Sequence, residues 1–162
     1  MEASRNMEPC LFRQIDIMAY KFKRQIGIPL VVQLNAIEKK YQNVTNASCN
    51  KGAYLYCELN IRPSAASPTY RIRVKQYPGR SPAAWLLSPK LQMKDGNYPR
   101  HVYSLGPPPE LCVFYPDGRE WTNKQLIADT FIPWISTWLN AYEYWLITGE
   151  WHYAESPHGV RK

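Results

Sequence analysis

The residue with the clearest chemical potential is a cysteine at the end of a proline-rich stretch. Cys112 follows the proline run 107–109 within the segment 99–121. Because proline fixes φ and resists helix formation, this segment should be extended and should present the cysteine outside a regular element. His101 lies eleven positions upstream of Cys112. A thiolate is the nucleophile in thioester exchange, so the segment predicts acyl transfer through Cys112.

A packing role is the alternative for the same residue. Leu111 and Val113 flank Cys112, and a free cysteine is among the most buried residue types. The histidine, the proline-rich approach, the following Trp121 and the helix expected after it together favour the reactive interpretation.

Composition limits the class of protein. The chain has 162 residues, of which 45% are hydrophobic and 20% charged, which is typical of one globular domain and excludes disorder throughout. No stretch reaches the ~18 apolar residues of a membrane span, and the N-terminus lacks the basic-then-apolar pattern of a secretory signal. We therefore expect a cytoplasmic protein without a membrane partner.

The cysteines and histidines predict neither a metal site nor a cofactor. They show no CxxC pair and no cluster at structural-zinc spacing, and in a reducing cytosol the thiols stay free. His152 and His158, in the tail, are expected to be surface groups. The four cysteines are Cys10, Cys49, Cys57 and Cys112.

Periodicity predicts an α+β fold. A helix is expected from Pro29, with Leu30, Leu34, Ile37 and Tyr41 on its apolar face, and the polar run 42–52 ends it. Alternation then predicts strands over 54–61 and 70–75, and a third strand lies around 85–87. Short loops between them favour an antiparallel meander. Cys57 falls on the inward face of the first of these strands, which predicts a packing role.

The C-terminal third predicts a short strand and helices. Val113–Tyr115 reads as a short strand, and Thr122 or Asn123 is a suitable cap for a helix that Pro133 should interrupt or restart. An apolar stripe then runs to Leu146, and Gly149 should end the helix. Residues 1–22 give no clear pattern.

The order of these features resembles the active-site segment of ubiquitin-conjugating enzymes. In that family, too, a histidine precedes a loop, a cysteine follows, and a tryptophan and a helix come next; here these are His101, Cys112, Trp121 and the helix expected after it. The resemblance covers 29–151 and implies a UBC-like fold, an antiparallel β-meander with an N-terminal helix and C-terminal helices packed on it. It implies one domain over 1–162, with 1–28 as an N-terminal extension and 150–162 as a tail.

The resemblance also implies roles for three residues. Cys112 would be the nucleophile that carries a thioester. The family stabilises the oxyanion with a His-Pro-Asn motif, whereas Val102 and Tyr103 follow His101 here. His101 is therefore assigned to organising the loop, and Tyr103 is a candidate donor in place of the missing asparagine.

The C-terminal stretch 133–153 resembles one branch of the family in particular. It is similar to the C-terminally short conjugating proteins of bacterial anti-phage operons of the cyclic-oligonucleotide signalling (CBASS) type. That resemblance implies a cGAS/DncV-like nucleotidyltransferase as partner, whose C-terminal tail would be held as a thioester on Cys112. Transfer to an amine, on an acceptor protein or a small molecule, would prime second-messenger synthesis.

Two other functions stay open. A non-catalytic module of the same fold could hold the cyclase through its aromatic residues and its basic strand face. The net charge of +7 and the face formed by Arg71, Arg73 and Lys75 would suit a nucleic-acid-binding domain. The cysteine segment makes nucleic acid the less expected partner.

Overall fold

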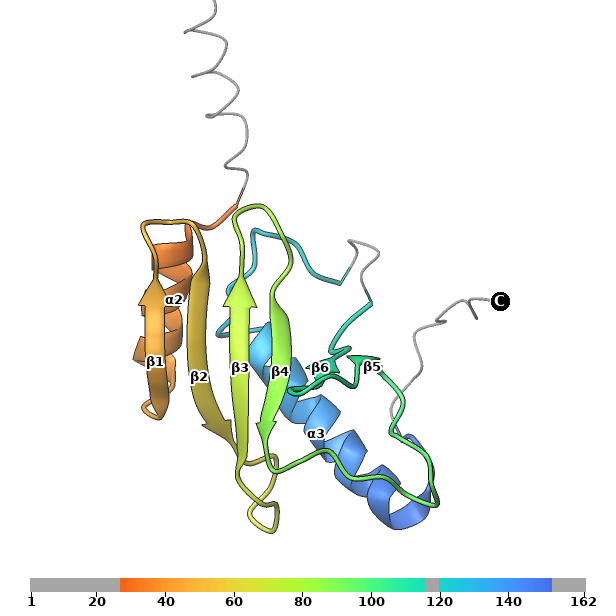
Figure 1. The fold of residues 1–162 in the computed structure, drawn as a ribbon. Coiled ribbons are helices and arrows are strands. Elements are labelled where there is room, and N and C mark those ends of the chain that lie inside the picture. The colour runs from red at the N-terminus through yellow and green to blue at the C-terminus, as the bar shows by residue number, and fades with distance from the viewer. Residues whose placement is uncertain (1–26, 116–119, 153–162) are drawn as a thin grey trace, which may run out of the picture.

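A single antiparallel sheet with both helices on one side forms the described part of the molecule (Figure 1). The computed structural model describes residues 27–115 and 120–152. Its six strands lie in the order β1-β2-β3-β4-β6-β5, which confirms the predicted α+β class. In chain order the elements are α2 (Leu30–Lys40), β1 (Val44–Cys49), β2 (Leu55–Ile61), β3 (Tyr70–Gln76), β4 (Ala83–Ser88), β5 (Val102–Ser104), β6 (Glu110–Leu111) and α3 (Phe131–Thr148).

The helix α2 forms where its apolar spacing predicts. Leu30, Leu34 and Ile37 are buried because residues three and four apart share one helical face. Pro29 is the N-cap, and Tyr41 ends the helix in an extended conformation. The Tyr41 hydroxyl donates to the carbonyl of Ala128 at 2.8 Å, which ties this end of α2 to the segment that leads into α3.

The meander β2–β3–β4 supplies the sheet side of the core. β2 and β3 pair over their whole length, from Leu55 opposite Gln76 to Ile61 opposite Tyr70. The inward side chains of β2 include Cys57, which is 0% exposed, and this confirms its predicted packing role. Because alternate residues of a strand face opposite sides, Glu58 and the basic residues of β3 lie on the other face.

The polar run after α2 contains a strand, so the prediction of a loop there is wrong. β1 pairs with β2 from Val44 opposite Leu59 to Cys49 opposite Leu55. It is an edge strand of the sheet, and its four middle residues are all exposed. A strand that buries neither face shows no apolar alternation, which is why the sequence pattern missed it.

The C-terminal region has one helix among the described residues, where two were predicted. Residues 122–130 form turns, and α3 begins only at Phe131. Pro133 therefore lies in the first turn, where its missing N–H would have had no helical acceptor, and it does not interrupt the helix. Gly149 ends α3 with φ 84° and donates its N–H to Trp145 at 2.8 Å. The apolar stripe packs on the sheet as core.

The basic residues on the outer face of the meander have partners within the chain. Arg71 and Arg73 both pair with Glu58, which is 2% exposed. Lys75 lies 4.7 Å from the ring centroid of Tyr54 and 4.8 Å from that of Tyr77. The predicted basic face is thus a network of internal partners, which leaves less charge for phosphate groups.

In the part of the chain that the structure describes, neither helix has the length and apolar character needed to cross a bilayer.

Candidate functional site

Cys112 directly follows the short strand β6. β6 pairs with β4 on one side and with β5 on the other, so that Leu111 lies opposite both Ala84 and Val102. The predicted strand over Val113–Tyr115 is absent, because the chain pairs before the cysteine and leaves the sheet after it. Cys112 itself lies outside a regular element, as expected, yet only 7% of its surface is exposed.

His101 holds this segment through its backbone. Its carbonyl accepts the N–H of Cys112 at 2.8 Å and the indole N–H of Trp138, in α3, at 3.0 Å. The residue has φ 59°, a left-handed conformation that non-glycine residues adopt rarely. Its ring lies 5.2 Å from the ring of Trp151 between centroids. One carbonyl therefore joins the cysteine segment to the C-terminal helix.

The thiol of Cys112 lies beside two polar groups. The Tyr103 hydroxyl is close enough to lower the pKa of the thiol, and the thiol donates to the carbonyl oxygen of Phe114 at 3.8 Å. The Tyr103 hydroxyl also lies 3.4 Å from that carbonyl. The neutral thiol donates to Phe114, and when the thiol ionises the Tyr103 O–H can donate to the sulfur instead.

The groups around the sulfur shift the pKa of Cys112 in opposite directions. Burial raises the pKa of Cys112, the hydrogen bond from Tyr103 lowers it, and the charge of Glu120 raises it, with a net increase. Burial also raises the pKa of Tyr103, as do its hydrogen bond with Cys112 and the charges of Cys112 and Glu110. Tyr103 thus keeps its proton near neutral pH and remains a hydrogen-bond donor.

A cavity of about 380 Å³ adjoins this group. Tyr103, Glu110, Val113 and Phe114 line one part of it, and the end of the β3–β4 turn with the start of β4, Ser81–Ala83, lines another. Tyr103, which lines this cavity, is 54% exposed, whereas Cys112 is 7% exposed. The site thus combines a thiol, a hydroxyl group and an adjoining cavity.

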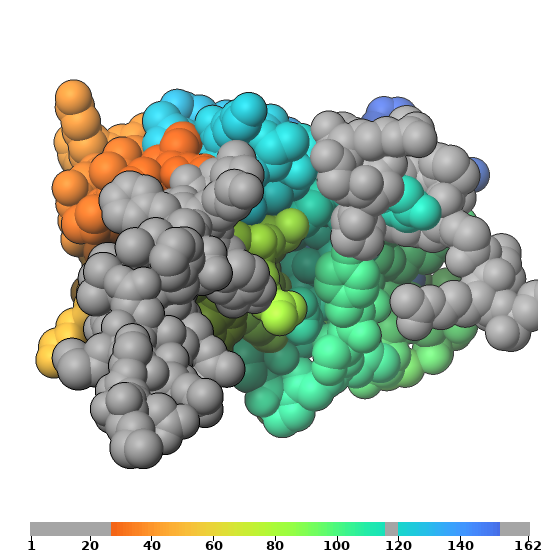
Figure 2. Space-filling model, turned by 90° about the horizontal axis from the view of Figure 1, so that it is seen from above, coloured from red at the N-terminus to blue at the C-terminus, as the bar shows by residue number. Residues whose placement is uncertain are grey.

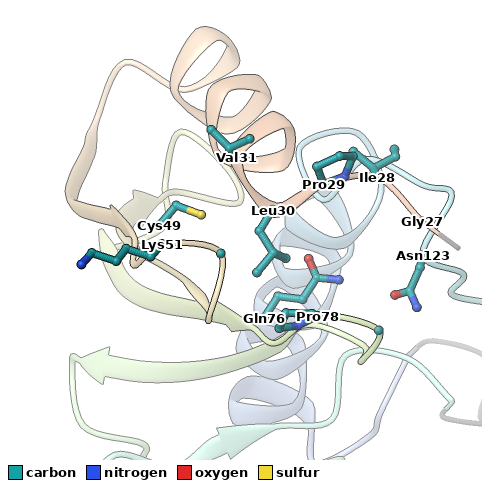
Figure 3. A pocket seen from close by; sticks show the side chains of 12 residues that line it. Gly27, Ile28, Pro29, Leu30, Val31, Cys49, Lys51, Gln76, Pro78 and Asn123 are labelled. Carbon is teal, nitrogen blue, oxygen red and sulfur yellow. The ribbon is translucent and has the colours of Figure 1, made fainter. Parts of the chain in front are cut away.

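A second cavity, of about 390 Å³, lies on the other side of the same turn. Figure 2 shows that turn between the orange α2 end of the molecule and the green segment of β5 and β6. Gln76 and Asn123 approach the second cavity from different elements (Figure 3). Its thiol is Cys49, and it shares no lining residue with the first cavity. Cys112 lines neither cavity, but its neighbours Leu111 and Val113 line the first.

Among the described residues, no group of His, Cys, Asp and Glu side chains is arranged to hold a metal ion.

Comparison with known families identifies the chain. Residues 33–159 match the family described as type II CBASS E2 protein. The chain belongs to this family. The match confirms the resemblance to a ubiquitin-conjugating-like protein of a CBASS operon and supports an E2-like role beside the CBASS cyclase. A comparison with curated proteins finds no match.

Sequence reasoning identified Cys112, His101 and Tyr103, and the E2 fold brings all three together. It missed the carbonyl of Phe114, the indole of Trp138 and the carboxylate of Glu110. The indole of Trp138 reaches this segment only through the folding of α3 and leaves no local pattern, whereas the Phe114 carbonyl lies only two residues from Cys112. Glu110 had a usable signal, because residues two apart in an extended segment lie on the same face.

Proposed function

We propose that this CBASS E2 protein carries the C-terminus of its partner nucleotidyltransferase as a thioester on Cys112 and passes it to an amine. The Cys112 thiol and the Tyr103 hydroxyl share the Phe114 carbonyl as acceptor, beside a cavity that Tyr103 lines, and this arrangement is the observation that carries the proposal. The pair supplies a nucleophile together with a donor that can follow the charge from sulfur to oxygen.

Loading is a thioester exchange. The Cys112 thiolate attacks the carbonyl carbon of an acyl thioester presented by an activating partner. A new C–S bond forms, the original C–S bond breaks, and the departing thiolate takes up the proton that Cys112 released. Only a small fraction of Cys112 is ionised at neutral pH, which is sufficient because the acyl group arrives activated.

Access to the sulfur requires the Tyr103 ring to move aside. This ring is the more exposed of the two partners, and rotation of an exposed side chain takes place in picoseconds to nanoseconds. When the ring returns, its hydroxyl donates to the oxyanion of the tetrahedral intermediate, as the replacement for the missing asparagine of the His-Pro-Asn motif.

Transfer to the acceptor follows the same geometry. The amine nitrogen attacks the thioester carbon, a C–N bond forms, and the C–S bond to Cys112 breaks. The proton of the attacking nitrogen passes to the departing sulfur. The His101 carbonyl, bonded to both Cys112 and Trp138, holds the segment during the exchange.

Intact mass spectrometry tests the proposal. The protein is incubated with a synthetic thioester of the nucleotidyltransferase C-terminal peptide, or purified with the cyclase, and is analysed with and without a reducing agent. We expect an adduct that reducing thiols remove, a stable oxyester with Cys112→Ser, and none with Cys112→Ala.

Cys57→Ser is the matched control, because Cys57 is a second buried thiol in the same fold. It should retain the full adduct. A reducible adduct that persists in Cys112→Ala, or one lost equally in both serine variants, would contradict the assignment to Cys112.

The small exposure of Cys112 favours one alternative, a non-catalytic UBC-fold module that holds the cyclase. In that case Cys112 is a packing residue, cyclase binding survives Cys112→Ala, and no thioester forms on any variant. Pull-down of the cyclase alongside the mass measurement separates the two functions.

A further inference from the structure

The second cavity contains two buried amide oxygens that lack a donor. Gln76 is 3% exposed, and its Oε1 atom has no hydrogen-bond partner among the described residues. Its Nε2 atom donates to the carbonyl of Arg80 at 2.9 Å, which fixes the amide so that Oε1 is the atom left over. The Oδ1 atom of Asn123 is likewise buried, and no described residue donates to it. Both residues line the cavity, and a buried acceptor without a donor costs free energy.

The position of Asn123 is set by the chain segment that precedes α2. The backbone carbonyl of Asn123 accepts the N–H of Ile28 at 2.7 Å. A Cβ atom at Gly27 would lie 2.6 Å from the Cβ atom of Asn123, so this close approach requires glycine. Figure 3 shows the side chains of Gln76 and Asn123 near one another on the side of the cavity below the start of α2. Backbone contacts therefore hold an unpaired oxygen at the cavity wall.

The N-terminal end of α2 offers donors to the same cavity. Pro29 is the N-cap, and no described side chain caps the helix with a hydrogen bond. The first N–H groups of a helix have no partner within the helix and carry partial positive charge, so they favour a hydrogen-bond acceptor. Pro29, Leu30 and Val31 all line the cavity. The cavity thus presents acceptors from Gln76 and Asn123 and donors from the first turn of α2.

We propose that this cavity binds a small, flat, uncharged molecule whose edge carries an NH₂ group beside a hydrogen-bond acceptor. The NH₂ group donates to Oε1 of Gln76 and to Oδ1 of Asn123, and the neighbouring acceptor takes an N–H from the first turn of α2. A carboxamide on an aromatic ring and the amino edge of adenine share this chemistry. The inference is independent of the thioester proposal, because Cys112 does not line this cavity.

The rest of the lining favours an uncharged and mainly apolar ligand. It includes Ile28, Leu30, Val31 and two prolines, and the described lining residues contain no carboxylate. An ammonium group would therefore be buried without a counter-charge. Lys51 is the one charged residue of this lining, and its side chain points away from the cavity in Figure 3. The volume of about 390 Å³ lies within the range of small-molecule sites.

Paired ligands that differ only in the NH₂ group test the inference. The isotopically labelled full chain is titrated with nicotinamide and with adenine, and each titration is repeated with the compound in which a methyl group replaces the NH₂ group. By NMR we expect saturable shifts at the N–H groups of Leu30 and Val31 and at the side-chain amides of Gln76 and Asn123 with at least one NH₂ compound. Its methyl counterpart should bind about tenfold more weakly, because the two oxygens then stay unpaired.

The two NH₂ compounds distinguish the sources of this chemistry. Binding of nicotinamide alone would assign the site to carboxamides, and binding of adenine alone would assign it to nucleobases. Equal binding of both members of a pair would overturn the inference, because the NH₂ group would then contribute nothing. The absence of saturable shifts with either NH₂ compound would also overturn it and would mean that the two oxygens bond to water only.

Asn123→Leu separates binding from folding. Leucine has the branching of asparagine and removes an oxygen that lacks a donor among the described residues. The melting temperature should therefore stay the same or rise, while the affinity for the NH₂ compound falls about tenfold. Gln76→Met, which keeps the length of the side chain and removes Oε1, should weaken binding in the same way.

Asn43→Leu is the matched control. The Asn43 amide donates to the carbonyl of Asn60 and lines a different cavity, so this variant should bind the NH₂ compound with the parent affinity. Parent affinity in both Asn123→Leu and Gln76→Met, or equal weakening in Asn43→Leu, would overturn the inference.

Discussion

Cys57 and Cys112 are both buried, yet their surroundings differ. Cys57 lies in the middle of β2, and burial, with the charges of Glu38 and Glu58, raises its pKa to about 12. Cys112 lies just past β6, with the Tyr103 hydroxyl and the Phe114 carbonyl beside its sulfur. Exposure alone does not separate a packing cysteine from a candidate nucleophile. What distinguishes Cys112 is the pair of polar groups beside its sulfur and the cavity that its neighbours line.

The largest expected change in stability comes from substitution of Glu58, which lies on the opposite face of β2 from Cys57. Burial disfavours its charge, but hydrogen bonds from Tyr56, Asn46, Arg73 and Arg71 outweigh burial and lower its pKa to about 2. We expect Glu58→Gln to reduce the free energy of unfolding by about 2 to 3 kcal/mol at neutral pH, measured by urea denaturation.

The Glu58 carboxylate also makes the stability of the fold depend on pH in the acidic range. Because the pKa of Glu58 is lowered in the folded state from 4.5 to about 2, its contribution is present above the unfolded pKa and is lost as the pH falls toward the folded one. Between those values the parent protein should lose stability more steeply than Glu58→Gln. Alkylation of Cys112 in the folded variant should be unchanged, and a large change would show that the two regions are coupled.

A smaller effect is expected from serine in place of each cysteine. Cys57→Ser places a hydroxyl in a fully buried apolar site and should cost roughly 1 to 2 kcal/mol. Cys112→Ser should cost less, because the Phe114 carbonyl and the Tyr103 hydroxyl can bond the new hydroxyl. Thermal denaturation of both variants gives the comparison, and a greater loss for Cys112→Ser would place that residue with the packing cysteines.

The smallest effect concerns the reactivity of Cys112. Tyr103→Phe removes the hydrogen bond that lowers the pKa of Cys112, so less thiolate is present at a given pH. Loss of about 1 kcal/mol corresponds to alkylation by iodoacetamide that is slower by roughly fivefold. The rate should rise with pH in both proteins, and Cys57 should stay unmodified while the protein is folded. Faster alkylation in Tyr103→Phe would mean that the ring mainly blocks access.

Several features were readable from local sequence. The apolar spacing of Leu30, Leu34 and Ile37 defined α2, and strict alternation defined β2 and β3, because both patterns follow from the geometry of a single element. The proline run before Cys112 and the histidine upstream identified the cysteine segment. Cys57 was assigned to the core from its place in the alternation alone.

Other features depended on partners far along the chain. β1 has a polar sequence, and it is a strand because β2 offers an unpaired edge. β6 is two residues long and ends before Cys112 because β4 and β5 pair with it there. The turns over 122–130 could not be separated from a helix by capping residues, since a cap predicts where a helix can begin and not whether the chain continues in one.

The sequence by itself determined that this chain folds as an α+β meander and that one cysteine differs from the others, since backbone preferences and apolar periodicity are local properties. Only the tertiary structure decided what surrounds that cysteine. The Tyr103 hydroxyl lies near the thiol, and the His101 carbonyl accepts from both the Cys112 N–H and the Trp138 indole, because β5, β6 and α3 pack together. Contacts of this kind set the pKa and the access of a thiol, and no local pattern records them.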